Sequence, residues 1–83
     1  MNNFYWSDSH QNTKNFNKHA IIDLIRFTPN GISRIELARE LGLTRAAITS
    51  SVNDLLEVEL VREIEGKYPN GRKPIVLEIN PSR

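Results

Sequence analysis

Residues 32–56, ISRIELARELGLTRAAITSSVNDLL, constrain the fold most, because they carry the start and stop signals of two helices joined by a tight turn. Ser33 followed by Glu36 is a capping box, which predicts that a helix begins directly after Ser33. Gly42 predicts the end of that helix, because glycine adopts the left-handed conformation without a Cβ penalty. Thr44 is then the expected N-cap of a second helix.

Each predicted helix has an apolar face for the core. The first helix is expected to bury Ile35, Leu37, Ala38 and Leu41. The second is expected to bury Ile48, Val52, Leu55 and Leu56. The opposite side of the second helix carries Arg45, Ala46, Thr49, Ser50 and Asn53. A solvated helix face normally carries Glu and Lys, so this short, polar and nearly uncharged face favours close approach to a partner. It is typical of a helix-turn-helix, whose second helix lies in the DNA major groove. An ordinary helical hairpin with a Ser/Thr-rich outer face is the alternative.

The flanking residues predict one further helix and a hairpin. A helix starting near residues 13–15 and ending before Pro29-Asn30-Gly31 is expected to bury Phe16, Ala20, Ile21, Leu24, Ile25 and Phe27. Ile32 is expected as one rung of a sheet. After the second helix of the pair, a half-buried strand is expected at 60–65, where Leu60, Arg62 and Ile64 alternate with Val61, Glu63 and Glu65. A second strand at 74–80 places Ile75, Leu77 and Ile79 on one face. The predicted fold class is α+β: a winged helix-turn-helix with three helices packed on a small antiparallel β-hairpin wing.

Composition limits the classes of function. Eighty-three residues form one domain with one small core, and leave little room for a deep substrate pocket, so no enzyme is expected. The chain has no cysteine, and His10 and His19 are interpreted as surface residues, so neither a metal nor a cofactor is expected. No apolar run is long enough to predict a membrane span. The net charge is only +1, but residues 67–83 hold four cations against one anion.

The loop at 66–73, GKYPNGRK, holds three of these four cations at the predicted wing tip. Arg72 is the candidate for insertion into a narrow minor groove. The candidates for contact with the DNA backbone or minor groove are Arg34, Thr44, Lys67, Arg72 and Lys73. The candidates for base readout are Arg45, Ala46, Thr49, Ser50 and Asn53, with arginine suited to guanine and asparagine to adenine. Asn53 is far enough along its helix that contact with a phosphate is its alternative. A solvated hairpin tip is the alternative for the wing.

With both parts assembled, the chain resembles the N-terminal winged-helix domain of ROK-family bacterial sugar-responsive transcriptional repressors. The resemblance rests on ISRIELARELGLTRAAITSSVNDLLEVELVRE, followed by GRKP and a strand ending in IN, and covers about residues 15–80. It implies a DNA-binding domain at 13–80, double-stranded A·T-rich operator DNA as partner, and a homodimer in the full-length protein. It also implies a bacterial cytoplasmic, nucleoid-associated location, and a sugar effector bound by a sugar-kinase-like domain that is absent from this chain.

Two further expectations concern the ends of the chain and one departure from the family pattern. Residues 1–12 are expected to be a flexible tail, with the aromatic cluster Phe4, Tyr5 and Trp6 either docked or forming a protein contact, and residues 81–83 a tail at the junction to the absent domain. Glu59 stands where relatives commonly have glycine, so it either adopts a strained conformation or alters the exit of the helix. The rival function is a winged helix used for protein contact.

Overall fold

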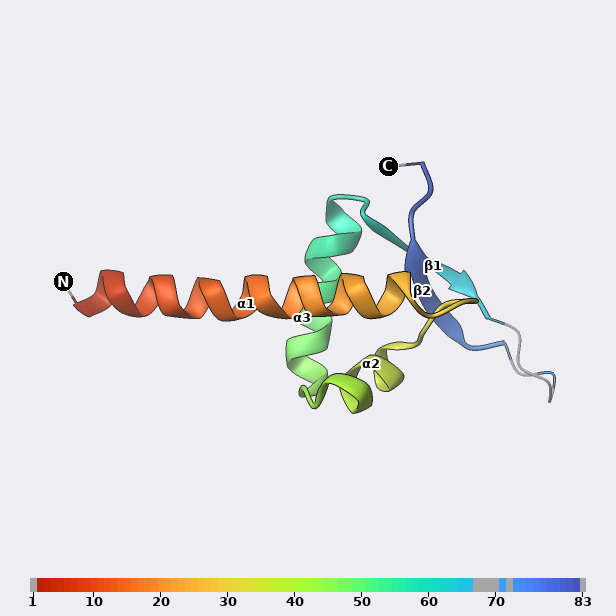
Figure 1. Cartoon of the computed structure of the whole chain (residues 1–83), viewed down its shortest axis with the longest axis horizontal. Coiled ribbons are helices and arrows are strands. Elements are labelled where there is room, and N and C mark those ends of the chain that lie inside the picture. Colours follow the sequence, from red (N-terminus) through yellow and green to blue (C-terminus); the bar gives the residue numbers. More distant parts are fainter. Residues whose placement is uncertain (1, 67–70, 72, 83) are drawn as a thin grey trace.

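The computed structural model describes the backbone of residues 2–66, 71 and 73–82, and the side chains of those residues from Thr13 onward. Three helices, α1 (Asn2–Arg26), α2 (Arg34–Leu41) and α3 (Arg45–Glu57), precede two strands, β1 (Val61–Glu65) and β2 (Ile75–Ile79). The strands pair antiparallel, with Val61 opposite Ile79 and Glu65 opposite Ile75. Figure 1 shows α1 crossing α3, with the hairpin beyond the C-terminal end of α1. The predicted α+β winged helix-turn-helix is confirmed.

Helix α1 is longer than predicted and buries fewer residues. It begins at Asn2, within the stretch expected to be a tail, and no proline or glycine interrupts its 25 residues. Its N-terminal part projects beyond α3 (Figure 1). Ile21 and Ile25 are buried as predicted, but Phe16 and Phe27 are 73% and 76% exposed. The prediction for both phenylalanines was wrong: Phe16 lies on the side of α1 opposite to Ile25, and Phe27 follows the last residue of the helix.

The predicted caps of α2 are confirmed. The Ser33 hydroxyl accepts a hydrogen bond from the Glu36 amide, and the Ser33 amide donates to the Glu36 carboxylate. Gly42 ends the helix in the left-handed conformation, with φ 66°. Leu37 is buried, but Ile35 is 56% exposed, contrary to prediction. Residues two apart lie on opposite sides of a helix, so Ile35 and Leu37 do not share an inner face.

Helix α3 begins at the predicted N-cap, where the Thr44 hydroxyl accepts a hydrogen bond from the Ala47 amide. At its other end, the amide of Leu60 donates to the Leu55 carbonyl and the amide of Glu59 donates to the Leu56 carbonyl. These two bonds form a Schellman motif, which requires a left-handed residue. Glu59 is that residue, with φ 63°, so the helix exit keeps the geometry that glycine favours.

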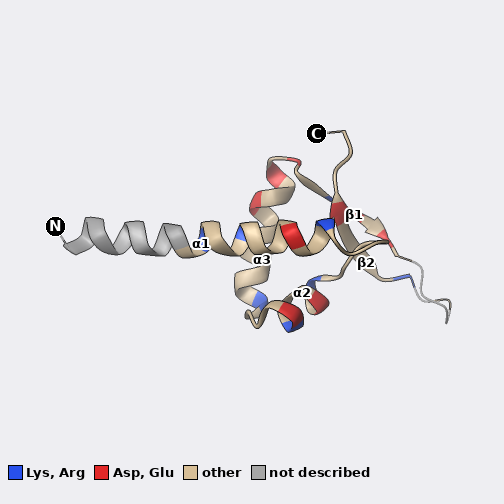
Figure 2. Cartoon of the chain, viewed as in Figure 1, with Lys and Arg blue, Asp and Glu red and all other residues tan. Residues whose placement is uncertain are grey.

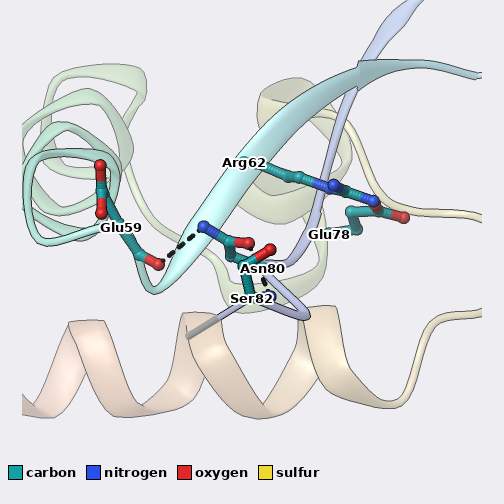
Figure 3. A network of polar contacts seen from close by, with 5 residues as sticks. All are labelled: Glu59, Arg62, Glu78, Asn80 and Ser82. Carbon is teal, nitrogen blue, oxygen red and sulfur yellow. Dashed lines mark hydrogen bonds and ion pairs between the residues drawn. The ribbon is translucent and has the colours of Figure 1, made fainter.

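The polar side chain of Asn80 holds this exit to the end of β2. The side-chain Nδ2 donates to the Glu59 carbonyl at 3.1 Å, and the backbone amide of Asn80 donates to the Leu60 carbonyl at 3.0 Å. Its Oδ1 accepts a hydrogen bond from the Ser82 amide, while Arg62 and Glu78 pair across the strands (Figure 3). The asparagine of the IN sequence therefore joins the hairpin to the α3–β1 turn and satisfies the carbonyl of the left-handed residue.

A third backbone segment pairs with the hairpin. Ile32 and Leu77 exchange two hydrogen bonds, of 3.1 and 2.8 Å, which confirms the predicted rung before α2. Strand β2 is regular, so Ile75, Leu77 and Ile79 lie on one face as predicted, with Leu77 in the core and Ile79 packed against it. The burial pattern differs from a simple alternation, because Ile75 is 51% exposed and Val76 is buried. Val76 lies on the face opposite to Leu77 and is covered there by Gly31 and Gly66, whose lack of side chains leaves room for it.

The core lies where the three helices meet the hairpin. It joins residues of every element and of the Ile32 rung, and consists of Ile21, Ile25, Ile32, Leu37, Ile48, Val52, Leu55, Val61 and Leu77. The start of β1 contributes Val61, while Leu60 is 37% exposed. The packing fixes α2 and α3 relative to the hairpin, and so determines which face of α3 remains open.

Candidate nucleic-acid interface

The five residues predicted for base readout all lie on the open side of α3. Arg45, Ala46, Thr49, Ser50 and Asn53 are each exposed. Ile48, Ser51, Val52 and Leu55 are buried on the other side of the same helix. The open face therefore has small, polar side chains and a cation at its N-terminal end, with no acidic residue among the five.

A groove of about 690 Å³ borders this face on the side of α2 and β2. Its lining combines three arginines with the N-cap of α2 and the start of β2: Ser33, Arg34, Ile35, Glu36, Arg39, Arg45, Pro74 and Ile75. Arg34 Nη1 donates to Glu63 Oε2 at 3.1 Å, so β1 holds the guanidinium in place. A guanidinium has five N–H donors, and this pairing leaves others available to a second anion.

A second groove, of about 280 Å³, borders the other side of the same face. It is lined by residues of α1 and α3: Thr13, Lys14, Asn17, Ala47, Ser50 and Ser51. At its edge the ammonium groups of Lys14 and Lys18 lie 2.9 and 3.4 Å from Asp54 Oδ2. The hydrogen bond from Lys14, followed by that from Lys18, holds the pKa of the Asp54 carboxyl below its ordinary value.

The remaining candidate residues are only partly placed. Thr44 is exposed and caps α3, and its hydroxyl hydrogen remains available as a donor. Lys73 is exposed on the segment that leads into β2. Lys67 and Arg72 lie outside the described residues, as do the side chains of Phe4, Tyr5, Trp6 and His10.

The charges of the described residues are distributed unevenly around this surface. Figure 2 shows cationic and acidic residues side by side on α2, a cationic residue at the start of α3 and acidic residues toward the end of α3. Within the described part of the chain, no cluster of His, Cys, Asp or Glu is arranged to hold a metal ion. None of the helices described there is both long and apolar enough to span a bilayer.

These features define a class of protein: a winged helix-turn-helix of the kind found in transcription regulators. In a crystal structure described as a ROK family transcriptional regulator, a homologue of the E. coli MLC protein, the matching region has a TM-score of 0.65 and 29% sequence identity. The match covers 82% of this chain and 17% of that protein. No protein-family model matches the sequence.

Three curated proteins to which this chain is similar are xylose repressors. The repressor of Staphylococcus xylosus is 39% identical over 69 residues, which are 80% of this chain and 18% of the repressor. The repressors of Bacillus spizizenii and Bacillus subtilis are 34% and 33% identical over 64 residues, which are 76% of this chain and 16% of each. The resemblance to the N-terminal domain of ROK-type repressors is therefore confirmed. The chain spans less than a fifth of the length of these relatives.

The sequence interpretation missed several residues that border the α3 face. Ile35 and Arg39 line the groove toward β2, and Lys14 and Asn17 line the groove toward α1. The spacing of Ile35 and Leu37 was a signal for the first groove, because it excludes Ile35 from the buried face. The second groove had no local signal, since it depends on the place where α1 crosses α3.

Proposed function

We propose that this chain is the DNA-binding domain of a transcriptional repressor and that α3 enters the major groove of double-stranded DNA. The observation that carries the proposal is the exposure of all five residues of the open α3 face. Thr, Ser and Asn side chains offer donors and acceptors, and Ala46 allows close approach. The names of the relatives, repressors and a transcriptional regulator, support this role and favour it over an enzyme.

Base readout is assigned by the chemistry of each side chain. Arg45, at the N-terminal end of α3, is suited to bind guanine O6 and N7 through two hydrogen bonds. Ala46 and Thr49 offer methyl groups to a thymine methyl. Ser50 is suited to donate to or accept from a base edge, and Asn53, two turns into the helix, pairs with adenine or contacts a phosphate.

The groove beside α2 supplies contacts with the DNA backbone. Arg34 is held by Glu63 at the edge of this groove, and Lys73 is exposed at its β2 side. The free hydroxyl hydrogen of Thr44 and the first amides of α3 attract a phosphate oxygen. Lys67 and Arg72, in the wing loop, extend this contact to the backbone or minor groove. Phosphate contacts position the domain, while the α3 face specifies the sequence.

We also propose properties of the whole protein, which rest on the resemblance to ROK-family repressors. The full-length protein is a cytoplasmic bacterial repressor that binds A·T-rich operators as a homodimer. A dimer places its two α3 helices about one helical turn of DNA apart, or a multiple of it. A sugar binds elsewhere in the full-length protein and releases the operator, as the name of the xylose repressors suggests.

The test compares Arg45→Ala with Arg26→Ala, which removes an exposed arginine at the C-terminal end of α1. Fluorescence anisotropy measures binding of the 83-residue chain to an A·T-rich palindromic duplex and to a scrambled duplex of the same composition. Arg45→Ala is expected to lose discrimination equivalent to about 1–3 kcal/mol, and Arg26→Ala to retain it. Binding should also weaken steeply as salt is raised. Wild-type affinity in the Arg45→Ala chain would contradict the assignment of α3.

The rival function, a module for protein contact, is supported by a different surface. Protein interfaces are usually anchored by large apolar or aromatic side chains, which the open face of α3 lacks. The exposed Phe16 and Phe27 are such side chains, but they lie on α1 and directly after it, not on α3. An α3 variant that lost DNA binding while a Phe16→Ala variant kept it would separate the two surfaces.

A further inference from the structure

The exposed face of α3 is bordered by two grooves, one on each side. Arg34, Ile35, Arg45 and Thr49 line a small pocket on the α2 side, which continues the arginine-lined groove. On the α1 side, Lys14 and Asn17 face Ala47 and Ser50. A helix in the major groove, which is about 12 Å wide, has a phosphate strand on each side of it. With α3 in the major groove, each of the two protein grooves would border one of the two phosphate strands of the DNA.

We propose that α1 is part of the DNA interface, and that Lys14 and Asn17 bind the phosphate strand opposite to the one contacted by α2 and the wing. The proposal rests on the proposed function, because it requires α3 to lie in the major groove. It adds α1 to the helix-turn-helix and the wing as a part of the DNA interface.

The charge of the α1–α3 junction suits an anionic partner. Lys14 and Lys18 share the single carboxylate of Asp54, so the three side chains together carry one excess positive charge. Their contact fixes the Lys14 ammonium beside α3, and an ammonium has three donors, more than one carboxylate oxygen uses. The side chain of Lys14 remains 34% exposed, which leaves it accessible to a phosphate oxygen.

The shape of the same junction allows a phosphate strand to approach. Ala47 and Ser50, the α3 residues at this groove, are small, and Ser50 is exposed with a hydroxyl that can donate to a phosphate. Asn17 lies one turn after Lys14 on α1 and offers two amide donors. Amide, hydroxyl and ammonium donors thus line one groove between α1 and α3.

The test uses three single variants of the 83-residue chain, with Arg26→Ala as the control for loss of a cation from the same helix. Anisotropy is measured with the A·T-rich duplex at several salt concentrations, after circular dichroism has shown that each variant is folded. Lys14→Ala should bind about threefold to tenfold more weakly at low salt, with the log–log salt slope smaller by about 0.9. Asn17→Ala should bind about twofold to fivefold more weakly. Asp54→Asn, which removes the anion, should bind more tightly.

The opposite signs for Lys14→Ala and Asp54→Asn separate phosphate binding from a structural role. If the cluster only joins α1 to α3, both variants lower stability and both keep the wild-type affinity and salt slope for DNA, which would overturn the proposal. If Arg45→Ala weakens binding while Lys14→Ala and Asn17→Ala do not, only the role of α1 is refuted. If the wild-type chain does not bind the duplex, the proposed function of α3 fails as well.

Discussion

Replacing Gly31 with alanine should destabilise the domain far more than the same change at Gly42. Both glycines have positive φ, 88° and 66°, so alanine at either position pays a conformational cost of about 1–2 kcal/mol. A Cβ on Gly42 meets nothing within 4 Å, whereas one on Gly31 would lie 2.6 Å from Val76 Cγ2 and 3.1 Å from the Leu77 carbonyl oxygen. Val76 is buried, so it has little room to move.

The difference between the two variants measures the packing of the hairpin against the turn before α2. Overpacking typically costs about 1–3 kcal/mol, so Gly31→Ala should lose that much more stability than Gly42→Ala. For a domain of this size, each kcal/mol corresponds to about 4–8 °C in Tm. Urea unfolding followed by circular dichroism measures both variants, and the free energies of unfolding are compared with that of the wild type.

A double variant shows whether the cost comes from Val76. A Val76→Ala background removes the contact with Val76 Cγ2, while the conformational cost and the close approach to the Leu77 carbonyl oxygen remain. Gly31→Ala should therefore cost less in this background, with a coupling energy of up to about 1–3 kcal/mol. Equal losses of stability for Gly31→Ala and Gly42→Ala would refute the close approach of Gly31 and Val76.

Three further changes test the caps and the ion pairs. Glu59→Gly should raise the free energy of unfolding by about 0.5–1 kcal/mol in urea titrations, because glycine adopts φ 63° without strain; a loss of stability would argue against the left-handed exit of α3. Ser33→Ala should lower the free energy of unfolding by about 1 kcal/mol, because the N-cap of α2 is lost. The control Ser50→Ala, at an exposed position, should lower it by less than about 0.5 kcal/mol. Equal effects of the two changes would contradict the capping box. The lowered pKa of Asp54 in the folded chain adds stability that is present above its unfolded value of 3.8 and is lost as pH falls through the folded pKa. Asp54→Asn should therefore show a smaller fall in the urea midpoint with acid, and an unchanged pH profile would exclude this contribution.

The sequence was sufficient wherever the signal is local. The capping box at Ser33, the left-handed Gly42 and the N-cap at Thr44 are each set by a few neighbouring residues, and the structure contains all of them. The exposed face of α3 could also be predicted, because the apolar residues of this 13-residue helix recur at helical spacing and leave the opposite face open.

Predictions failed where burial depends on contacts between distant segments. Val76 is buried only because Gly31 and Gly66 cover it, and no pattern within β2 indicates that cover. Phe16 and Phe27 were assigned to the buried stripe of the first helix, but Phe16 lies on the side of α1 away from Ile25 and Phe27 follows the end of α1, and both are exposed. The contact of Lys14 and Lys18 with Asp54 depends on how α1 crosses α3, which the sequence alone does not specify.

An NMR titration of the isotope-labelled chain with A·T-rich duplex DNA tests the DNA-binding surface most directly. Amide signals should shift along the open face of α3, from Thr44 to Asn53, and at Lys73, and these shifts should diminish at high salt. Shifts at residues 14–17 would extend the contact surface to α1. Shifts elsewhere in the chain, with the amide signals of α3 unchanged at the same DNA concentrations, would contradict the placement of α3 in the major groove.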